Sequence, residues 1–204
     1  MPDTPAAGRR RQRRRALRFA LALAPALAVA GSAAPGAPRG PAKMDALLAL
    51  IEADPSLPRD RRVEAKPRAL RRELVCVALA IFHEARSEIP AGRYAVAMVA
   101  RNRADARGAT LCAVVWAPRQ FSWTAHPLPR LVPREPGAWA RSLDEACDVV
   151  LDGMKDITGG ADHFFNPASV FPAWARRAVR SRQIGAHRFL RLSPLPPAAA
   201  AAAR

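Results

Sequence analysis

The most regular hydrophobic pattern in the chain is an unbroken apolar run at residues 74–82, LVCVALAIF. A helix built from these residues would be apolar on every side, which is typical of a helix buried all round. The run follows Glu73 and gives way to His83 and Glu84. The pattern therefore predicts a buried helix with polar groups at its C-terminal end.

Three further segments have the composition of helices. Residues 91–103 follow Pro90, which suits a first helical position, and close with Arg and Asn residues, which suit a helix C-terminus. Residues 136–152 place apolar side chains on one stripe and precede Gly153, a common helix stop. An apolar stretch at residues 44–51 predicts a short helix.

Short extended runs replace helical periodicity after a Gly-Gly pair near residue 160. Residues 163–166 and 187–192 are compatible with two strands of a small antiparallel sheet. Between the helices predicted at residues 91–103 and 136–152 lies a polar, proline-rich stretch that predicts a functional loop.

Composition divides the chain into four parts. Residues 1–30 are typical of a secretory signal, because clustered arginines precede an apolar run that ends at Ala30 with small residues at cleavage spacing. Residues 31–72 predict a Pro-, Ala- and Arg-rich linker with the short helix, and residues 194–204 predict a disordered Pro and Ala tail. A catalytic domain is therefore expected at residues 73–193.

The signal determines where we expect the protein to act. Its apolar run is shorter than the roughly 20 residues of a membrane-spanning helix, which favours cleavage near Ala30 over a permanent anchor. We therefore expect an exported protein, in the periplasm or cell envelope.

The whole chain is strongly basic, with 33 Lys and Arg against 17 Asp and Glu. Removal of residues 1–30 leaves 26 basic and 16 acidic residues, a formal charge of +10. In an exported protein this charge favours peripheral contact with anionic envelope polymers, and we expect no nucleic-acid partner. Arginine spread over a solvated surface is an equally good interpretation. The oligomeric state is not predicted.

Cysteine and histidine spacing fits no metal site. Cys76, Cys112 and Cys147 permit one disulfide with one thiol left over in an oxidising compartment, and we favour Cys76 with Cys112. Three separate buried thiols are the alternative. His83 precedes Glu84 without a second histidine four residues after the first, so no zinc helix is predicted. We expect neither a metal nor a cofactor.

Glu84 is the candidate catalytic residue. A carboxylate at the end of an apolar helix either pairs with a cation, here Arg86 or Arg101, or has its pKa raised by burial. A raised pKa is what glycosidic cleavage requires of its proton donor. Glu88, one turn later, is a possible secondary carboxylate, although Pro90 favours an exposed Glu88 that only orients the loop.

Aromatic and polar side chains able to bind a sugar occur in the loop and after the paired glycines. Aromatic rings can cover the apolar face of a sugar, and amides can hydrogen-bond an acetamido group. The alternatives are ordinary core packing and, for an Asn before Pro, a turn. We expect substrate contacts from Gln120, Ser122, Trp123, His163, Phe165, Asn166 and Trp174.

Six sequence blocks in this order resemble the SleB-type cell wall hydrolases, the family of the spore cortex-lytic enzymes. The blocks are IFHEARSEIPAG, AVAMVARNR, RQFSW, TGGADHFFNP, AWARR and IGAHRF. The resemblance runs from about residue 74 to residue 192. The block order is specific, whereas each block alone would be weak.

The resemblance implies a compact α+β fold, a lysozyme- or lytic-transglycosylase-like helical domain with a small antiparallel sheet. It also implies one essential glutamate, at the position of Glu84. Peptidoglycan would be the substrate, cut between N-acetylmuramic acid and N-acetylglucosamine to give 1,6-anhydro ends. A hydrolytic muramidase and a non-catalytic peptidoglycan-binding module are the alternatives. The family block usually has Gly at Ser87 and Gln at Arg93, and Arg93 could pair with Glu88.

Overall fold

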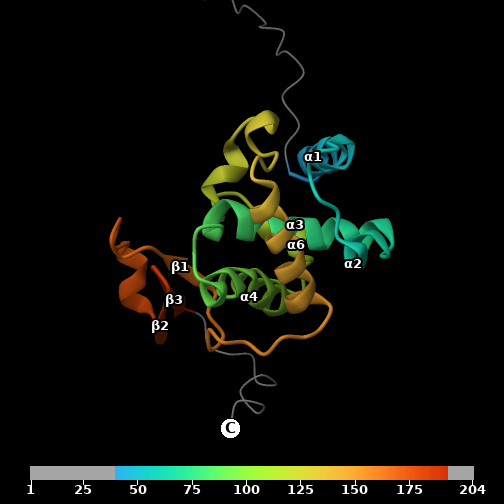
Figure 1. The fold of residues 1–204 in the computed structure, drawn as a ribbon. Coiled ribbons are helices and arrows are strands. Elements are labelled where there is room, and N and C mark those ends of the chain that lie inside the picture. Colours follow the sequence, from blue (N-terminus) through green and yellow to red (C-terminus); the bar gives the residue numbers. More distant parts are fainter. Residues whose placement is uncertain (1–39, 193–204) are drawn as a thin grey trace, which may run out of the picture. The chain divides into compact units, whose positions relative to one another are not determined.

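Helix α3 (Arg68–Ala85) makes the most connections in the fold. The computed structural model describes residues 40–192. Within this range α3 contacts all five other α-helices, α1, α2, α4, α5 and α6 (Figure 1). Residues 74–82 are buried, which confirms the predicted helix buried all round. The predicted signal and tail lie outside the described residues.

The described residues before α3 are packed against the core. Helix α1 (Pro41–Ala53) is longer than the short helix expected at residues 44–51, and α2 (Arg61–Glu64) follows it. A side chain of Asp60 caps α2 by accepting from two backbone N–H groups. Four residues of α1 belong to the same buried cluster as α3: Met44, Leu47, Leu48 and Ile51.

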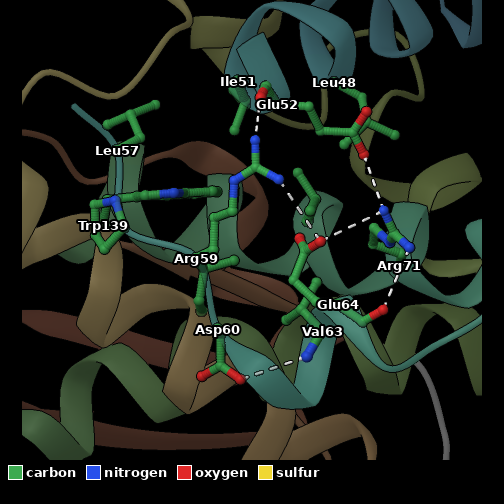
Figure 2. A pocket seen from close by; sticks show the side chains of 13 residues that line it. Leu48, Ile51, Glu52, Leu57, Arg59, Asp60, Val63, Glu64, Arg71 and Trp139 are labelled. Atoms are coloured by element: carbon green, nitrogen blue, oxygen red, sulfur yellow. Dashed lines mark hydrogen bonds and ion pairs between the residues drawn. The ribbon is translucent and has the colours of Figure 1, made fainter. Parts of the chain in front are cut away.

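A small cavity lies between α1, α2, α3 and α6 (Figure 2). Its volume is about 30 Å³, enough for a water molecule and too small for a sugar. Arg71 reaches Glu52 at 3.5 Å and Glu64 at 3.7 Å on one side of it, and Trp139 lines the other. The charged side chains of this cavity therefore connect the two N-terminal helices to α3.

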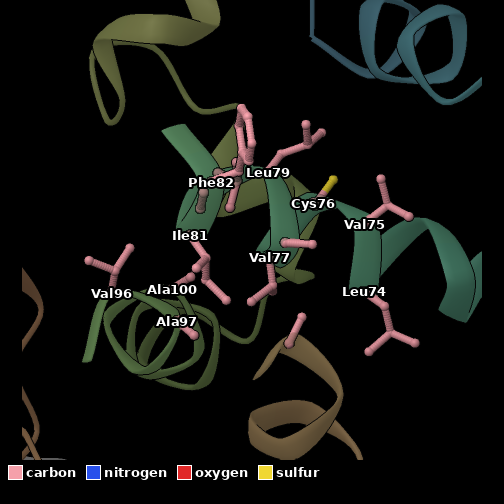
Figure 3. Packing of buried hydrophobic residues seen from close by; sticks show 14 of the residues in the cluster. Leu74, Val75, Cys76, Val77, Leu79, Ile81, Phe82, Val96, Ala97 and Ala100 are labelled. Carbon is pink, nitrogen blue, oxygen red and sulfur yellow. The ribbon is translucent and has the colours of Figure 1, made fainter. Parts of the chain in front are cut away.

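Helices α4 (Pro90–Arg107) and α6 (Pro136–Val150) pack against α3 and against each other. Figure 3 shows Ile81 of α3 with Val96, Ala97 and Ala100 of α4. Pro90 begins α4 as predicted, but α4 runs four residues beyond residue 103. Its expected closing cations therefore lie within the helix, because Gly108, in a left-handed conformation, provides the stop one turn later.

A disulfide joins α3 to the short helix α5 (Leu111–Val115). The Cα atoms of Cys76 and Cys112 are 5.3 Å apart, so the favoured pairing is confirmed. Cys147 on α6 is a buried free thiol.

The sheet has three antiparallel strands in the order β1, β3, β2. Strands β1 (His163–Phe165) and β3 (His187–Arg191) confirm the two predicted strands. Strand β2 (Arg180–Ile184) was not predicted, because its sequence RSRQI is polar and four of its five residues are exposed. Such a charged sequence is typical of an edge strand.

The sheet separates two clusters of apolar side chains. Phe164 and Phe189 are paired across β1 and β3 and pack against the main core, where the sheet contacts α4. Side chains alternate between the two faces of a strand, so Phe165 and Leu190 point the other way. They form a second, smaller cluster with Ala175 of the 3₁₀ helix η3 (Ala173–Arg177). The predicted α+β class is confirmed.

Candidate active site

Glu84 lies in the last turn of α3 and is partly buried. Its carboxylate makes no ion pair with any residue in the range 40–192. Burial raises the pKa of Glu84 above its ordinary value, and the charge of Arg103 and the indole of Trp123 oppose that rise only in part. The helix C-terminus also disfavours a negative charge there. Glu84 is therefore a carboxyl that holds its proton more tightly than usual.

The two cations considered as partners of Glu84 interact elsewhere. Arg86 pairs with Glu135 at 2.7 Å. Arg101 donates to the backbone carbonyls of Val149 and Met154, at 3.1 and 2.8 Å, near the end of α6. Of the two readings of Glu84, the structure favours burial over a salt bridge.

Trp123 provides an aromatic wall beside Glu84. It belongs to η1 (Ser122–Ala125), is 5% exposed, and stacks on His83 with ring centroids 4.6 Å apart. Its indole N–H forms no full hydrogen bond among the described residues, yet it acts as a weak donor that lowers the pKa of Glu84. That N–H is therefore available to donate a hydrogen bond to the Glu84 carboxyl when the carboxyl ionises.

His83, which stacks on Trp123, has a neutral imidazole ring. Its Nε2 lies 3.1 Å from the carbonyl oxygen of Leu131, so the N–H at this nitrogen donates to that oxygen. Burial lowers the pKa of His83 below its ordinary value. A neutral imidazole places no positive charge next to Glu84, and so it does not favour ionisation of the acid.

Arg103 is a site residue that the sequence analysis did not single out. It is 6% exposed, donates from Nε to the Asp162 carbonyl at 2.6 Å, and covers the ring of Phe121 at 5.5 Å. Burial lowers the pKa of Arg103 to about 10. Its helical spacing from Val96 and Ala100 placed it on the buried stripe of α4, and that spacing was the available signal.

The predicted sugar-binding aromatics fall into two groups. Trp123 lies with Glu84. The ring of Trp174 on η3 lies 5.1 Å from His163 and 5.8 Å from Phe165, within the smaller cluster on the other face of the sheet. Asp162 links the groups, because its carbonyl accepts from the Arg103 side chain and its carboxylate lies 2.8 Å from His163 Nδ1.

The predicted contacts Gln120 and Asn166 lie at turns, and Ser122 begins η1. Gln120 is partly buried and directly follows Arg119, whose backbone φ of 63° is uncommon for a residue other than glycine. Ser122 is exposed at the start of η1. The side chain of Asn166 accepts from the backbone N–H of Ala168 at 2.9 Å, so it has the turn-forming contact named as its alternative.

Glu88 fixes the turn between β2 and β3. Helix α3 has already ended at Ala85, and the expected exposure of Glu88 is wrong, because its side chain is 14% exposed. Its Oε2 accepts from the backbone N–H of Ala186 at 2.9 Å, and its Oε1 lies 3.4 Å from His187 Nδ1. The loop-orienting contact is present, and a role as a second carboxylate stays a prediction.

Arg93 does not pair with the carboxylate of Glu88. Its guanidinium reaches Glu145 of α6 at 2.7 Å, in a pair that is almost fully buried, and donates to the backbone carbonyl of Glu88 at 2.6 Å. The ion pair with Glu145 joins α4 to α6, and the hydrogen bond to the Glu88 carbonyl holds the chain that follows α3. Arg93 therefore supports the loop that follows Glu84.

Three of the four described histidines have polar side-chain partners that lie apart from one another: His83 a backbone carbonyl, His163 Asp162 and His187 Glu88. In the described part of the chain, no three His, Cys, Asp or Glu side chains gather as a metal site would require. The cavity of Figure 2 is not part of this site, because Glu84 does not line it.

Residues 87–190 match the family model described as Cell Wall Hydrolase. The chain belongs to the cell wall hydrolase family. Glu84 lies three residues before the matched range, whereas Trp123, η3 and the sheet up to Leu190 lie within it. The expected family is therefore confirmed.

Curated proteins similar to this family member include two named spore cortex-lytic enzyme. The one from Oceanobacillus iheyensis is 31% identical over 121 residues, which cover 57% of this chain and 41% of that protein. The one from Bacillus cereus is also 31% identical over 121 residues, covering 57% of this chain and 43% of that protein. The chain thus spans less than half the length of either relative.

Two solved structures are also similar to this cell wall hydrolase family member. The catalytic domain of the Bacillus cereus SleB protein is 26% identical, with a TM-score of 0.47, and the match covers 68% of this chain and 98% of that one. The catalytic domain of the germination-specific lytic transglycosylase SleB from Bacillus anthracis is 26% identical, with a TM-score of 0.49, covering 62% and 98%.

Proposed function

We propose that this chain cleaves peptidoglycan between N-acetylmuramic acid and N-acetylglucosamine, with Glu84 as the acid and base. Membership of the cell wall hydrolase family supports the substrate class. The observation that carries the residue assignment is the partly buried, unpaired Glu84 with its raised pKa beside Trp123. A carboxyl of this kind can donate a proton near neutral pH.

The proposed reaction has two proton transfers at one carboxyl. Protonated Glu84 donates to the oxygen of the glycosidic bond as that bond breaks. The resulting carboxylate then removes the proton from the 6-hydroxyl of the muramic acid, whose oxygen attacks its own C1 and forms a 1,6-anhydro ring. No second carboxylate is needed, because the substrate supplies the nucleophile. The Arg103 charge and the Trp123 N–H would stabilise Glu84 in its ionised intermediate state.

The substrate contacts are proposals of the same kind. Gln120, Ser122 and Trp123 belong to the segment beside Glu84 and would position the reacting sugars. The remaining contacts would come from the second group, on the far face of the sheet, and would bind a part of the polymer away from the reacting bond: His163, Phe165, Asn166 and Trp174.

Export is part of the proposed function. The arginine cluster and apolar run of residues 1–30 support a signal that is removed near Ala30, which would bring the enzyme to the periplasm or cell envelope. The basic charge of the remaining chain supports peripheral contact with anionic envelope polymers.

The activity is tested by incubating purified sacculi with the wild type and with Glu84→Gln. We expect wild-type digestion to release muropeptides with 1,6-anhydro ends, detected by mass spectrometry, and the variant to lose at least about a hundredfold in rate. Reducing ends without anhydro products would indicate a hydrolytic muramidase instead. Wild-type protein that pellets with sacculi and never digests them would indicate a binding module.

A further inference from the structure

The segment that forms the sheet and η3 carries positive charge without acidic neighbours in its own sequence. Residues 163–192 contain six arginines and no aspartate or glutamate. Two of them, Arg177 on η3 and Arg188 on β3, form no ion pair with any carboxylate in the part of the chain that the structure describes. Their guanidinium groups are therefore available to a carboxylate supplied by a ligand.

The register of the sheet places Arg188 on this outer face. Arg188 is the Cα partner of Phe165 in β1 and of Gln183 in β2, so the three side chains point to the same side. Phe165 belongs to the smaller cluster, which also marks this side as the one opposite the main core. Arg188 thus lies beside one of the proposed sugar-binding aromatics.

The geometry of η3 places Arg177 next to the other aromatic. Side chains three residues apart nearly eclipse each other in a 3₁₀ helix, so Arg177 extends from the same side of η3 as Trp174. Arg176, which is equally exposed, is aligned with Ala173 and lies on a different side of the helix. The outer face therefore presents one partly exposed aromatic ring, Trp174, which packs against the buried Phe165, with Arg177 and Arg188 on the same side.

We infer that this outer basic face, made of Phe165, Trp174, Arg177 and Arg188, binds the peptide stems of peptidoglycan through their free carboxylates. Arginine is suited to this role, because its planar guanidinium can donate two parallel hydrogen bonds to one carboxylate. The partly exposed ring of Trp174 supplies apolar surface for the adjoining sugar. The inference rests on the proposed function for its substrate, and it assigns the stems to a surface that catalysis at Glu84 does not use.

The test compares binding to intact sacculi with binding to the same glycan after an amidase has removed its stems. All proteins carry Glu84→Gln, so that cleavage does not consume the substrate. We expect Arg177→Gln with Arg188→Gln to weaken binding to intact sacculi roughly tenfold, as expected for two exposed charged contacts. Binding to stripped glycan should stay within about twofold of the parent protein.

The matched control is Arg176→Gln with Arg68→Gln, which removes the same charge from two exposed arginines outside the outer basic face. We expect this control to bind intact sacculi almost as well as the parent. Equal losses in the two double variants, or an equal loss on stripped glycan, would overturn the inference.

Failure of the inference and failure of the proposed function give different results. Stem-dependent binding can persist in a wild-type protein that releases no anhydro products, in which case only the catalytic proposal fails. Conversely, the wild type can digest sacculi to anhydro products while the Arg177 and Arg188 variant keeps an unchanged affinity for intact sacculi, in which case only the inference fails.

Discussion

Glu84 has neighbours that act on its ionisation in opposite directions. Burial raises its pKa, while the charge of Arg103 and the indole N–H of Trp123 lower it. An acid that must give up a proton and later take one back needs both influences, because either charge state must remain accessible. Burial raises the pKa of Glu84 and Arg103 lowers it, and we expect the resulting pKa to determine the working pH of the enzyme.

Replacing Arg103 by Met should raise the pKa of Glu84 further, because it removes a positive charge that favours the carboxylate. A general acid is active while protonated, so the alkaline limb of the pH–rate profile should move to higher pH. The measurement is the initial rate of sacculus clearing as a function of pH. Arg103→Lys keeps the charge and should keep the limb near its wild-type position.

The position of the limb is informative even if the Met variant is less stable. Arg103 contacts Phe121 and the Asp162 carbonyl, so its loss can reduce the amount of folded protein. Each rate is therefore divided by the folded fraction measured at the same pH, so that loss of folded protein does not move the midpoint of the limb. A Met variant with the wild-type midpoint would contradict the assigned role of Arg103.

Glu84→Gln should stabilise the fold in a pH-dependent manner. The pKa of Glu84 is higher in the folded state than in the unfolded state, so ionisation destabilises the folded protein as pH rises through this interval. Glutamine carries no charge, and we expect it to add about 1 kcal/mol at pH 8. Below about pH 4 the glutamate is protonated in both states and the gain should vanish.

Thermal unfolding of both proteins at these two pH values measures the effect. If Glu84→Gln raised the stability equally at both pH values, desolvation of the carboxylate would not be the cause of the increase. The same experiment is independent of catalysis, so it reports on the burial of Glu84 even if no product is formed.

At the scale of elements, α1 contributes to the core although it lies outside the family match. Leu47 of α1 is fully buried, whereas Leu50 is 44% exposed. Leu47→Ala should therefore lower the free energy of unfolding by about 3 kcal/mol, because it leaves a cavity in the main core. Leu50→Ala, the same change on the exposed side, should alter it by at most about 0.5 kcal/mol.

Urea denaturation of the two variants measures these free energies. Equal effects at the two positions would contradict the packing of α1 against α3. The pair also separates burial from helix propensity, because both changes replace Leu by Ala within the same helix.

The elements with strong periodicity were predicted with their type and approximate position. Helices α3, α4 and α6 have long apolar patterns, and β1 and β3 are short apolar runs. Strand β2 and helices α2 and α5 were not predicted. Each is five residues or shorter, and each is stabilised by neighbours: β2 by pairing with β3, α5 by the disulfide to α3, and α2 by contacts with α3 and α6.

At the scale of the whole molecule, the disulfide between Cys76 and Cys112 restricts the unfolded chain. It closes a loop of 36 residues, for which chain entropy predicts a stabilisation of about 4 kcal/mol. Reduction should therefore lower the Tm by roughly 10 °C. Calorimetry with and without a reductant measures this shift.

The control is Cys76→Ala with Cys112→Ala, which should unfold at the same low Tm in both conditions. Cys147 remains in this variant as a buried free thiol. A reductant-dependent Tm in the control would mean that another thiol reaction, and not the bond between α3 and α5, controls stability.

The sequence by itself determined the helices with long apolar patterns and the candidate acid, because a periodicity or a family motif is read from neighbouring positions. It favoured Cys76 with Cys112 as the disulfide pair but left three separate thiols as the alternative. The sequence left open whether Glu84 pairs with a cation, Arg86 or Arg101, or has its pKa raised by burial.

Only the tertiary structure decided which partners these side chains have. It placed Arg86 on Glu135, brought Arg103 near Glu84, and put Trp174 on the opposite side of the sheet from the main core. Such contacts join residues that are far apart in the sequence, and they depend on how α4 and the sheet pack together. A charge or a ring is read from one position, whereas its effect depends on the groups that folding places around it.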